Sequence, residues 1–313
     1  MKRLMLVCMA VLLSGNALAQ KYPDKRVTYV IPFAAGGESD IAARFQQELF
    51  RKRFGQEMTI DYKLGAGGGV AWSQLNSLPA DGHTIMGINL PHIVLQPMEG
   101  NVQYKTADLV PVYWFHYTPD AIVVAADSPH KTFPALVQAA RDKPGTITLA
   151  GSGTNSANHA AHEKFNELAE VKTTYVPYKG TGDLTTAVIG QHVSGAMSYV
   201  TFAITQKGKV RALAIATEKR HPLLPDVPTF RELGFEWVDG AYRGVAVPKS
   251  TPPAIQKQVS DMMAVLNQDS DMRRRMVEGG FEPIDISVEQ APAFLEERTR
   301  GYVAAAKRLG LAK

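Results

Sequence analysis

The segment Val27-Thr28-Tyr29-Val30-Ile31-Pro32-Phe33-Ala34-Ala35-Gly36-Gly37-Glu38-Ser39-Asp40 predicts a buried strand, a glycine turn and the start of a helix. Residues 27–31 are mostly apolar or β-branched on both faces, which is typical of a parallel strand covered on both sides. Pro32 cannot donate a hydrogen bond to a neighbouring strand, so the strand is expected to end there. Gly36 and Gly37 permit backbone angles closed to other residues and leave their amides open to a ligand.

The helix expected after this turn begins near Ser39 or Asp40, either of which can cap it. Its apolar stripe consists of Ile41, Phe45, Leu49 and Phe50. A strand that leads through glycines into a helix N-terminus presents several unpaired N–H groups, and this arrangement suits an anion. The alternative at this point is an ordinary turn between a strand and a helix, without a ligand.

The N-terminal residues have the pattern of a secretory signal peptide. Lys2 and Arg3 precede an apolar run, Leu4 to Leu13, that is too short to span a bilayer. Ala17-Leu18-Ala19 then provides small residues around a cleavage site. We therefore expect residues 1–19 to be removed and the mature chain to act outside the cytoplasm, in the periplasm of a Gram-negative cell.

Composition narrows the classes of function. The one cysteine, Cys8, lies in the predicted signal peptide, so disulfides, thiol nucleophiles and cysteine metal sites are not expected in the mature chain. The formal net charge of +4 falls to +2 when Lys2 and Arg3 are removed, which is no signature of nucleic-acid binding. The mature sequence has no further apolar run of membrane length, so direct membrane insertion is not expected either.

The rest of the chain alternates between strand and helix patterns. About 290 residues would remain after cleavage, more than one core usually organises, so two domains are expected. Strands are predicted at 58–62, 84–89, 110–116, 121–125, 146–150, 173–177, 193–200 and 210–216, and an extended segment at 237–248. Helices are predicted at 133–142, 157–170, 255–266, 269–278 and 288–309, with shorter ones after 69 and up to 188. This alternation is the signature of α/β architecture with mostly parallel sheets flanked by helices.

The last part of the chain, after Pro252-Pro253, is predicted to be helical alone. Such a segment cannot build its own sheet, so we expect it to return and cover the first domain. The predicted division is therefore a discontinuous lobe I, residues 20–119 plus 246–313, and a lobe II, residues 120–245.

A second glycine loop, residues 151–156, also follows a predicted strand and precedes a predicted helix. In open parallel sheets, ligands lie beyond the carboxyl ends of the strands. If the two sheets face each other, the loops at 33–40 and 151–156 line one cleft from opposite sides.

Motifs along almost the whole mature chain resemble, in order, those of the solute receptors of tripartite tricarboxylate transporters, also called Bug-type receptors. The matching segments are Tyr22-Pro23-Asp24-Lys25, Ile31 to Gly37 with Asp40, Gly65-Ala66-Gly67-Gly68, Pro79-Ala80-Asp81-Gly82-His83-Thr84, Asp127-Ser128-Pro129 with Lys131-Thr132, Gly151-Ser152-Gly153, Val176-Pro177-Tyr178-Lys179-Gly180, Gly208-Lys209-Val210-Arg211-Ala212-Leu213-Ala214, Leu224-Pro225-Asp226-Val227-Pro228-Thr229 and Arg243-Gly244-Val245-Ala246-Val247-Pro248. No single segment would suffice for this resemblance, but their order along the chain is specific.

The resemblance implies a two-domain Venus flytrap protein that captures a small organic carboxylate and passes it to the membrane permease subunits of the transporter. It implies no enzymatic activity, no cofactor and no metal, and we expect a monomer. The ligand-binding residues carried over are Ala35, Gly36, Gly37, Glu38, Ser39 and Asp40 from the first loop, Ser152, Gly153, Thr154, Asn155 and Ser156 from the second, and Asn89, His92, Tyr178 and Arg243 from elsewhere.

Two of these residues leave alternatives open. The family usually has Ser, Pro or Ala where this chain has Glu38, so its carboxylate either opposes an anion, selects a ligand that also carries an ammonium, or points outward into solvent. Arg243 can hold a carboxylate through its planar guanidinium, or it can form an ion pair between the lobes with Glu236 or Asp239.

Other patterns give weaker hypotheses. The glycines at 65–69 lack the third glycine of a dinucleotide fingerprint, which falls on Val70. His159 and His162 share a helix face, but no further metal ligands are marked by spacing. Ser152 is not in a G-x-S-x-G motif, so an exported serine hydrolase is disfavoured. A receptor that serves a sensor kinase instead of a permease would have the same fold.

Overall fold

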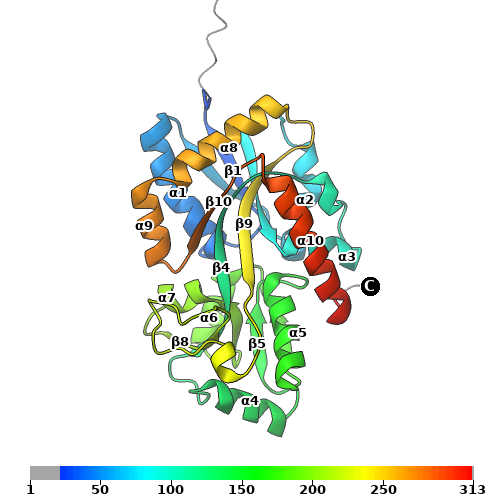
Figure 1. Cartoon of the computed structure of the whole chain (residues 1–313), viewed down its shortest axis with the longest axis vertical. Coiled ribbons are helices and arrows are strands. Elements are labelled where there is room, and N and C mark those ends of the chain that lie inside the picture. Colours follow the sequence, from blue (N-terminus) through cyan, green and yellow to red (C-terminus); the bar gives the residue numbers. More distant parts are fainter. Residues whose placement is uncertain (1–21, 312–313) are drawn as a thin grey trace, which may run out of the picture.

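The computed structural model of the chain describes residues 22–311, so the predicted signal peptide, residues 1–19, lies outside the described residues. Two α/β lobes stand one above the other in Figure 1. The long strand β4 (Val110–Ala125) runs through both, and β9 (Gly240–Val247) leads from the junction of the lobes into the upper one. We call the upper one, which holds β1 to β3, the first lobe, and the lower one, which holds β5 to β8, the second lobe. The predicted two-lobed α/β fold is confirmed.

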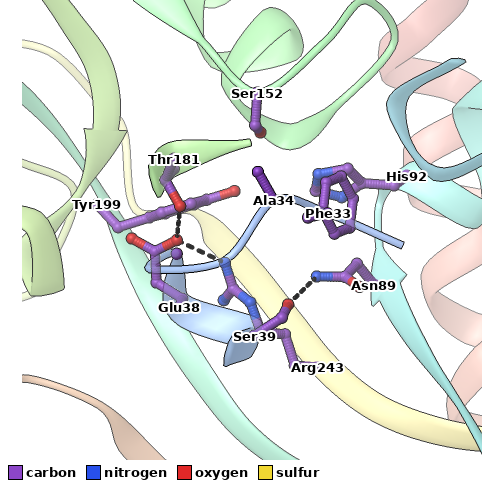
Figure 2. Close-up of a pocket in the computed structure, with 11 residues that line it drawn as sticks. Phe33, Ala34, Glu38, Ser39, Asn89, His92, Ser152, Thr181, Tyr199 and Arg243 are labelled. Atoms are coloured by element: carbon purple, nitrogen blue, oxygen red, sulfur yellow. Dashed lines mark hydrogen bonds and ion pairs between the residues drawn. The ribbon is translucent and has the colours of Figure 1, made fainter. Parts of the chain in front are cut away.

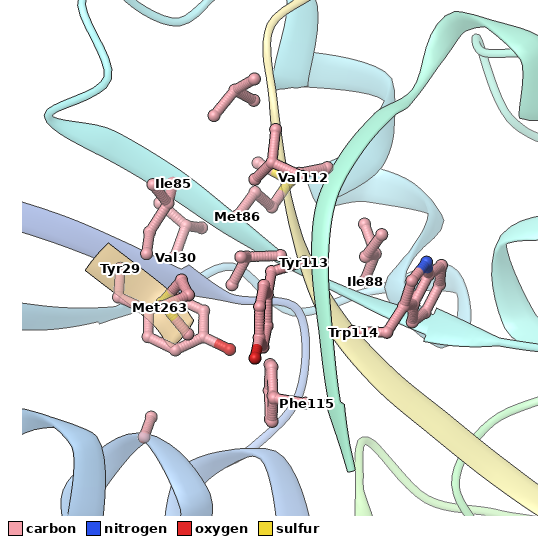
Figure 3. Close-up of a cluster of buried hydrophobic side chains, with 14 of the residues drawn as sticks. Tyr29, Val30, Ile85, Met86, Ile88, Val112, Tyr113, Trp114, Phe115 and Met263 are labelled. Carbon is pink, nitrogen blue, oxygen red and sulfur yellow. The ribbon is translucent and has the colours of Figure 1, made fainter. Parts of the chain in front are cut away.

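The first lobe begins with the unit predicted around the glycine turn. Its elements are β1 (Val27–Ile31), α1 (Glu38–Phe54), β2 (Met58–Tyr62), α2 (Gly69–Gln74), β3 (Thr84–Leu90) and α3 (His92–Glu99), with short 3-10 turns at Ala66–Gly68, Leu75–Ser77 and Thr106–Asp108. β1 pairs in parallel with both β2 and β3, as its two-sided burial requires. Apolar side chains from β1, β3, β4 and α8 form the core of this lobe (Figure 3).

The cap position of helix α1 lies two or three residues earlier than predicted, and no side chain caps the helix. Gly37 occupies the cap position, while Ser39 and Asp40 lie inside the first turn. Asp40 instead accepts a hydrogen bond from the backbone N–H of Gly36 (2.8 Å). This contact fixes the glycine turn, where Gly36 has a φ of 81° that favours glycine.

The second lobe repeats the strand and helix alternation. Its elements are α4 (Phe133–Asp142), β5 (Thr148–Gly151), α5 (Ala157–Ala169), β6 (Thr174–Pro177), α6 (Thr181–Ile189), β7 (Gly195–Tyr199), α7 (Val200–Thr205) and β8 (Val210–Ile215), with a 3-10 turn at Arg231–Leu233. β5 pairs in parallel with β6 and β7. Ser156 caps α5 by accepting a hydrogen bond from the His159 N–H.

β4 joins what the sequence predicts as two strands, 110–116 and 121–125. The strand continues through Pro119, which lies opposite Gly240 of β9. The backbone N–H of Asp120 bonds the carbonyl of Asp239 (3.0 Å), so the pairing of the two segments holds across the junction. The predicted domain limits at 119/120 and 245/246 thus fall within the two crossing strands, and the division of the chain at these residues stays a prediction.

The prediction that the chain ends in helices alone is wrong. Between α8 (Pro253–Asn267), α9 (Ser270–Glu278) and α10 (Ala291–Arg308) lies a strand, β10 (Glu282–Ile286), which pairs antiparallel with β4. The upper half of β4 has β9 on one side only, so β10 supplies its second neighbour. The predicted return to the first lobe is visible in Figure 1, where α8 and α9 lie against α1.

The ten strands found among the described residues, 22–311, belong to one continuous sheet. Its order is β2-β1-β3-β9-β4-β7-β5-β6, and β8 and β10 pair with β4 outside this path. The pairs between β1, β2 and β3 and between β5, β6 and β7 are parallel, whereas the pairs that involve β4 or β9 are antiparallel. No helix among residues 22–311 is long and apolar enough to cross a membrane.

Candidate functional site

The two lobes touch across the space between them, so the structure shows a closed form. On one side the Ala34 N–H approaches the Lys179 carbonyl (3.4 Å). On the other side the amide of Gln96 donates to the backbone carbonyls of Thr154 (2.5 Å) and Asn155 (3.3 Å). Every one of these contacts joins the first lobe to the second, and all of them must break when the lobes separate.

The loops that face each other are not quite the predicted pair. The turn at Gly36 and Gly37 approaches Thr181 and Gly182, at the start of α6, and not residues 151–156. The loop at 151–156 instead approaches Gly67 and Gln96. Glycines on both sides let the backbones come this close, because a side chain would hold them apart.

Between these contacts lies a pocket of about 260 Å³ with both lobes in its wall. Residues of the first lobe and of the crossing strand β9 form one side, and residues of the second lobe form the other (Figure 2). The lining residues are Phe33, Ala34, Gly37, Glu38, Ser39, Asn89, His92, Ser152, Thr181, Tyr199 and Arg243.

Glu38, the first residue of α1, is buried in this pocket with 5% of its surface exposed. Its carboxylate accepts hydrogen bonds from the hydroxyls of Thr181 and, at 3.0 Å, Thr201, and both threonines belong to the second lobe. Its Oε2 also lies 3.7 Å from Nη2 of Arg243. The interpretation of Glu38 as a solvated residue is therefore wrong, because α6 and α7 cover it when the lobes close.

Arg243 is equally buried, with 3% of its surface exposed. Besides its ion pair with Glu38, it donates to the hydroxyl of Thr118, and its guanidinium lies 4.8 Å from the centre of the Tyr199 ring. The predicted partners of an ion pair are wrong, because β9 turns Arg243 toward α1. Asp239 pairs with Lys164, and Glu236 pairs with Arg231.

His92, at the start of α3, is held uncharged. Burial, and then the nearby charge of Arg243, lower the pKa of His92 to about 3. Its Nε2 lies 3.5 Å from the backbone N–H of Ala157 in the second lobe and accepts that hydrogen. In a neutral imidazole the other nitrogen, Nδ1, then carries the proton and is a donor.

Three buried donors of the pocket have no hydrogen-bond partner among residues 22–311. They are Nδ1 of His92, Nε of Arg243 and the hydroxyl of Tyr199. Burial raises the pKa of Tyr199, so its hydroxyl keeps its hydrogen. Because buried polar groups are nearly always hydrogen-bonded in native proteins, such a set of donors fits an acceptor-rich ligand.

The fold and this interlobe pocket agree with the comparisons to known proteins. Residues 42–311 match the model of the tripartite tricarboxylate transporter family receptor, TctC. The chain belongs to this family. It is a solute-binding receptor of the TctC and Bug type, a family of periplasmic binding proteins.

Three solved structures share its fold closely, each at 27% sequence identity. The periplasmic binding protein BugD has a TM-score of 0.87 over 93% of this chain and 100% of that chain. MatC from Rhodopseudomonas palustris with bound malate has a TM-score of 0.83, over 91% of this chain and 99% of that chain. The R. palustris protein Rpa4515 with adipate has a TM-score of 0.86, over 93% and 99% respectively.

The pocket of this receptor gathers seven of the residues predicted to bind ligand. They are Gly37, Glu38, Ser39, Asn89, His92, Ser152 and Arg243. Asn89 donates to the Ser39 hydroxyl (3.4 Å), so these two side chains already orient each other. The hydroxyl and N–H of Ser152 both bond the amide oxygen of Asn158 (2.7 and 3.0 Å).

The other eight predicted residues do not line this pocket. They are Ala35, Gly36, Asp40, Gly153, Thr154, Asn155, Ser156 and Tyr178. Asp40 accepts hydrogen bonds from Tyr62 and Arg44, and Ser156 caps α5. The backbones of Thr154 and Asn155 act in the lobe contact with Gln96.

Four lining residues are absent from the individual residues predicted to bind ligand. Phe33 and Ala34 nevertheless belong to the loop at 33–40, which the sequence predicts to line the cleft. Thr181 and Tyr199 come from the second lobe, at the start of α6 and the end of β7. Tyr199 ends a predicted strand, and the rule that ligands lie beyond strand ends could have found it.

The residues behind the weaker hypotheses of a metal site and a serine nucleophile make other contacts. His162 bonds Glu163 (2.9 Å) and the Thr173 hydroxyl (2.8 Å), which ties it into the second lobe. Within residues 22–311, no group of three or more His, Cys, Asp or Glu side chains is placed to hold a metal ion. The Ser152 hydroxyl donates to an amide oxygen and not to a histidine, so no base is placed to activate it.

Proposed function

We propose that this receptor captures a small organic carboxylate between its lobes and delivers it to the membrane permease of a tripartite tricarboxylate-type transporter. The observation that carries the proposal is the set of three unpartnered buried donors on one interlobe pocket, formed by His92, Arg243 and Tyr199. A carboxylate offers about four lone-pair sites and no donor, so it complements this set.

The lining of the pocket and the relatives support a small acid. The lining combines the aromatic and apolar side chains of Phe33 and Ala34 with a few buried polar groups, as small-molecule sites commonly do. Related receptors have been solved with malate and with adipate, which are both short carboxylic acids. The pocket supplies binding groups but no activated nucleophile, so the receptor binds its ligand without changing it.

Closure follows from where the donors lie. His92 belongs to the first lobe, Tyr199 to the second, and Arg243 to the crossing strand β9. Only the closed form brings all three to one ligand, so binding shifts the equilibrium between open and closed lobes toward the closed form. The permease would then distinguish loaded from empty receptor by the closed arrangement of both lobes.

A thermal-shift screen over small acids, followed by titration calorimetry, tests the binding. A ligand at 100 times its Kd stabilises a protein by about 2.7 kcal/mol, which the screen detects. Tyr199→Phe should weaken the identified acid by about 1.5–3 kcal/mol, the usual value of a hydrogen bond to a charged group. Tyr178→Phe is the matched control, because Tyr178 does not line the pocket.

Two results would contradict the proposal at the level of binding. One is a panel of mono-, di- and tricarboxylates that produces no stabilisation at millimolar concentration. The other is equal affinity for the Tyr199→Phe and wild-type proteins. Delivery is tested separately, by uptake of the labelled acid into cells with and without the receptor.

A further inference from the structure

Glu38 places a negative charge inside a pocket that is otherwise built from hydrogen-bond donors. We propose that Glu38 makes this receptor selective for acids with a single carboxylate and against dicarboxylates of the same chain length. This inference rests on the proposed function, because it specifies which carboxylate the pocket takes.

The contacts of Glu38 are those that complement a carboxylate. Each of its three contacts, with Thr181, Thr201 and Arg243, comes from a group that donates, or from a positive charge. An ionised carboxylate only accepts hydrogen bonds, so it is matched on both oxygens by these partners. The protein thus supplies one buried carboxylate of its own to the pocket.

The charges of the pocket then balance before any ligand enters. Arg243 is the one cation among the lining residues, and Glu38 is the one anion. His92 is uncharged, and the remaining lining residues are neutral. A ligand with one carboxylate adds one negative charge and meets the free donors of His92, Tyr199 and Arg243.

The first ligand carboxylate is stabilised by the three free donors, whereas a second one would meet neither a free side-chain donor nor a counter-charge among the lining residues. The space is small, so both ends of a short diacid would lie within a few ångströms of the pocket wall that includes Glu38. A buried like charge without a partner is strongly unfavourable, and such a repulsive group is a common way to exclude a competing ligand. The interaction is only weakly screened, because Glu38 and Arg243 are both almost fully buried.

Glu38 also occupies second-lobe donors that a ligand would otherwise use. The hydroxyls of Thr181 and Thr201 belong to α6 and α7, and both are engaged by Glu38 in the closed form. The side chain therefore bridges the lobes as a fixed internal acid. A ligand does not need a second acid group to engage this part of the second lobe.

The test compares pairs of acids that have equal chain length. Calorimetric Kd values are measured for butyrate against succinate and for hexanoate against adipate, at low salt and neutral pH. We expect the monocarboxylate of at least one pair to bind at least tenfold more tightly than its diacid. In Glu38→Gln, which keeps the size but removes the charge, this ratio should fall at least tenfold.

Two further variants separate charge from folding and closure. Glu38→Asp keeps the charge and should retain the preference, even if it weakens both acids. Glu48→Gln removes an exposed charge from the same helix, far from the pocket lining, and should leave the ratio unchanged. Because the readout is a ratio for each variant, a general loss of closure does not imitate the expected result.

The possible failures are distinguishable. If the wild type binds both succinate and adipate as tightly as the matching monoacids, or if Glu38→Gln leaves the ratio unchanged, the inference about Glu38 is overturned while the carboxylate receptor stands. If neither monoacids nor diacids bind at millimolar concentration, the proposed function itself is overturned.

Discussion

Replacing Gly182 by alanine should block lobe closure without disturbing either lobe. Gly182 lies in the first turn of α6 with no positive φ, so alanine fits its backbone and favours the helix. In the closed form the new methyl carbon would lie inside contact distance of the Ala35 carbonyl oxygen, 3.0 Å from its carbon and 3.2 Å from the carbonyl carbon of Gly36. These atoms are backbone of the opposite lobe, so they cannot move aside as a flexible side chain would.

The expected loss in the free energy of lobe closure can be calculated from the hydrogen bonds that lengthen when the lobes move apart. Ordinary contact distances require the lobes to part by roughly 1 Å at this point. The hydrogen bond from Ala34 to Lys179, already 3.4 Å long, is then lost, and that from Thr201 to Glu38 stretches from 3.0 Å. A neutral bond contributes about 1 kcal/mol and one to a charged group about 1.5–3 kcal/mol, so closure should lose about 3 kcal/mol.

A loss of that size weakens ligand binding about 100-fold. Calorimetry with an acid found in the screen measures the affinity, and small-angle scattering measures whether the ligand still makes the protein more compact. The unfolding temperature without ligand should not fall. Gly301→Ala is the control, because Gly301 lies in α10 with nothing near its added methyl group. Wild-type affinity in Gly182→Ala would refute the idea that these backbones meet during closure.

The remaining predictions concern the second lobe contact and the pH dependence of stability. Gln96→Ala removes the donor to the Thr154 and Asn155 carbonyls and should weaken ligand binding by about 1 kcal/mol, or roughly fivefold, by calorimetry. An unchanged Kd would remove this contact from the closing mechanism. Burial, and then the Arg243 charge, hold the pKa of His116 well below its ordinary value of 6.5. The unfolded chain therefore binds the extra proton first, so stability is full above pH 6.5 and falls as the pH drops below it. Urea unfolding at pH 7.5 and 5 should show a smaller difference for His116→Phe than for the wild type, and equal differences would contradict this account.

Local patterns were sufficient for much of the first lobe. The run from Val27 to Ile31 and the glycines after it predict β1 and the turn into α1, because burial on both faces and backbone freedom are properties of a few adjacent residues. β10 was missed for the opposite reason. It forms a strand by pairing with β4. The sequence of Glu282–Ile286 has no strong alternation of apolar and polar residues that would predict a strand.

The site also depends on contacts between distant segments, which local sequence patterns do not predict. The position of Arg243 in the register of β9, opposite Asn89 and His116, turns its guanidinium toward α1, and no spacing in the sequence reveals that register. The burial of Glu38 depends on threonines more than 140 residues away, which cover it only when the lobes close. A departure from the family pattern could mark Glu38 as unusual, but its partners required the three-dimensional structure.

The return of the chain to its first lobe has a consequence for the order of folding. The second lobe is built from one continuous stretch between the crossing strands, so its sheet closes over short sequence separations. The first lobe needs β10 beside β4, and α9 beside α1, where Arg275 bonds Glu48 across more than 200 residues. Contacts between distant segments form late, and a chain appears from its N-terminus onward. We therefore expect the first lobe to complete its core last. β1 to β3 reach their native packing only after the second lobe has folded and the C-terminal helices have been synthesised.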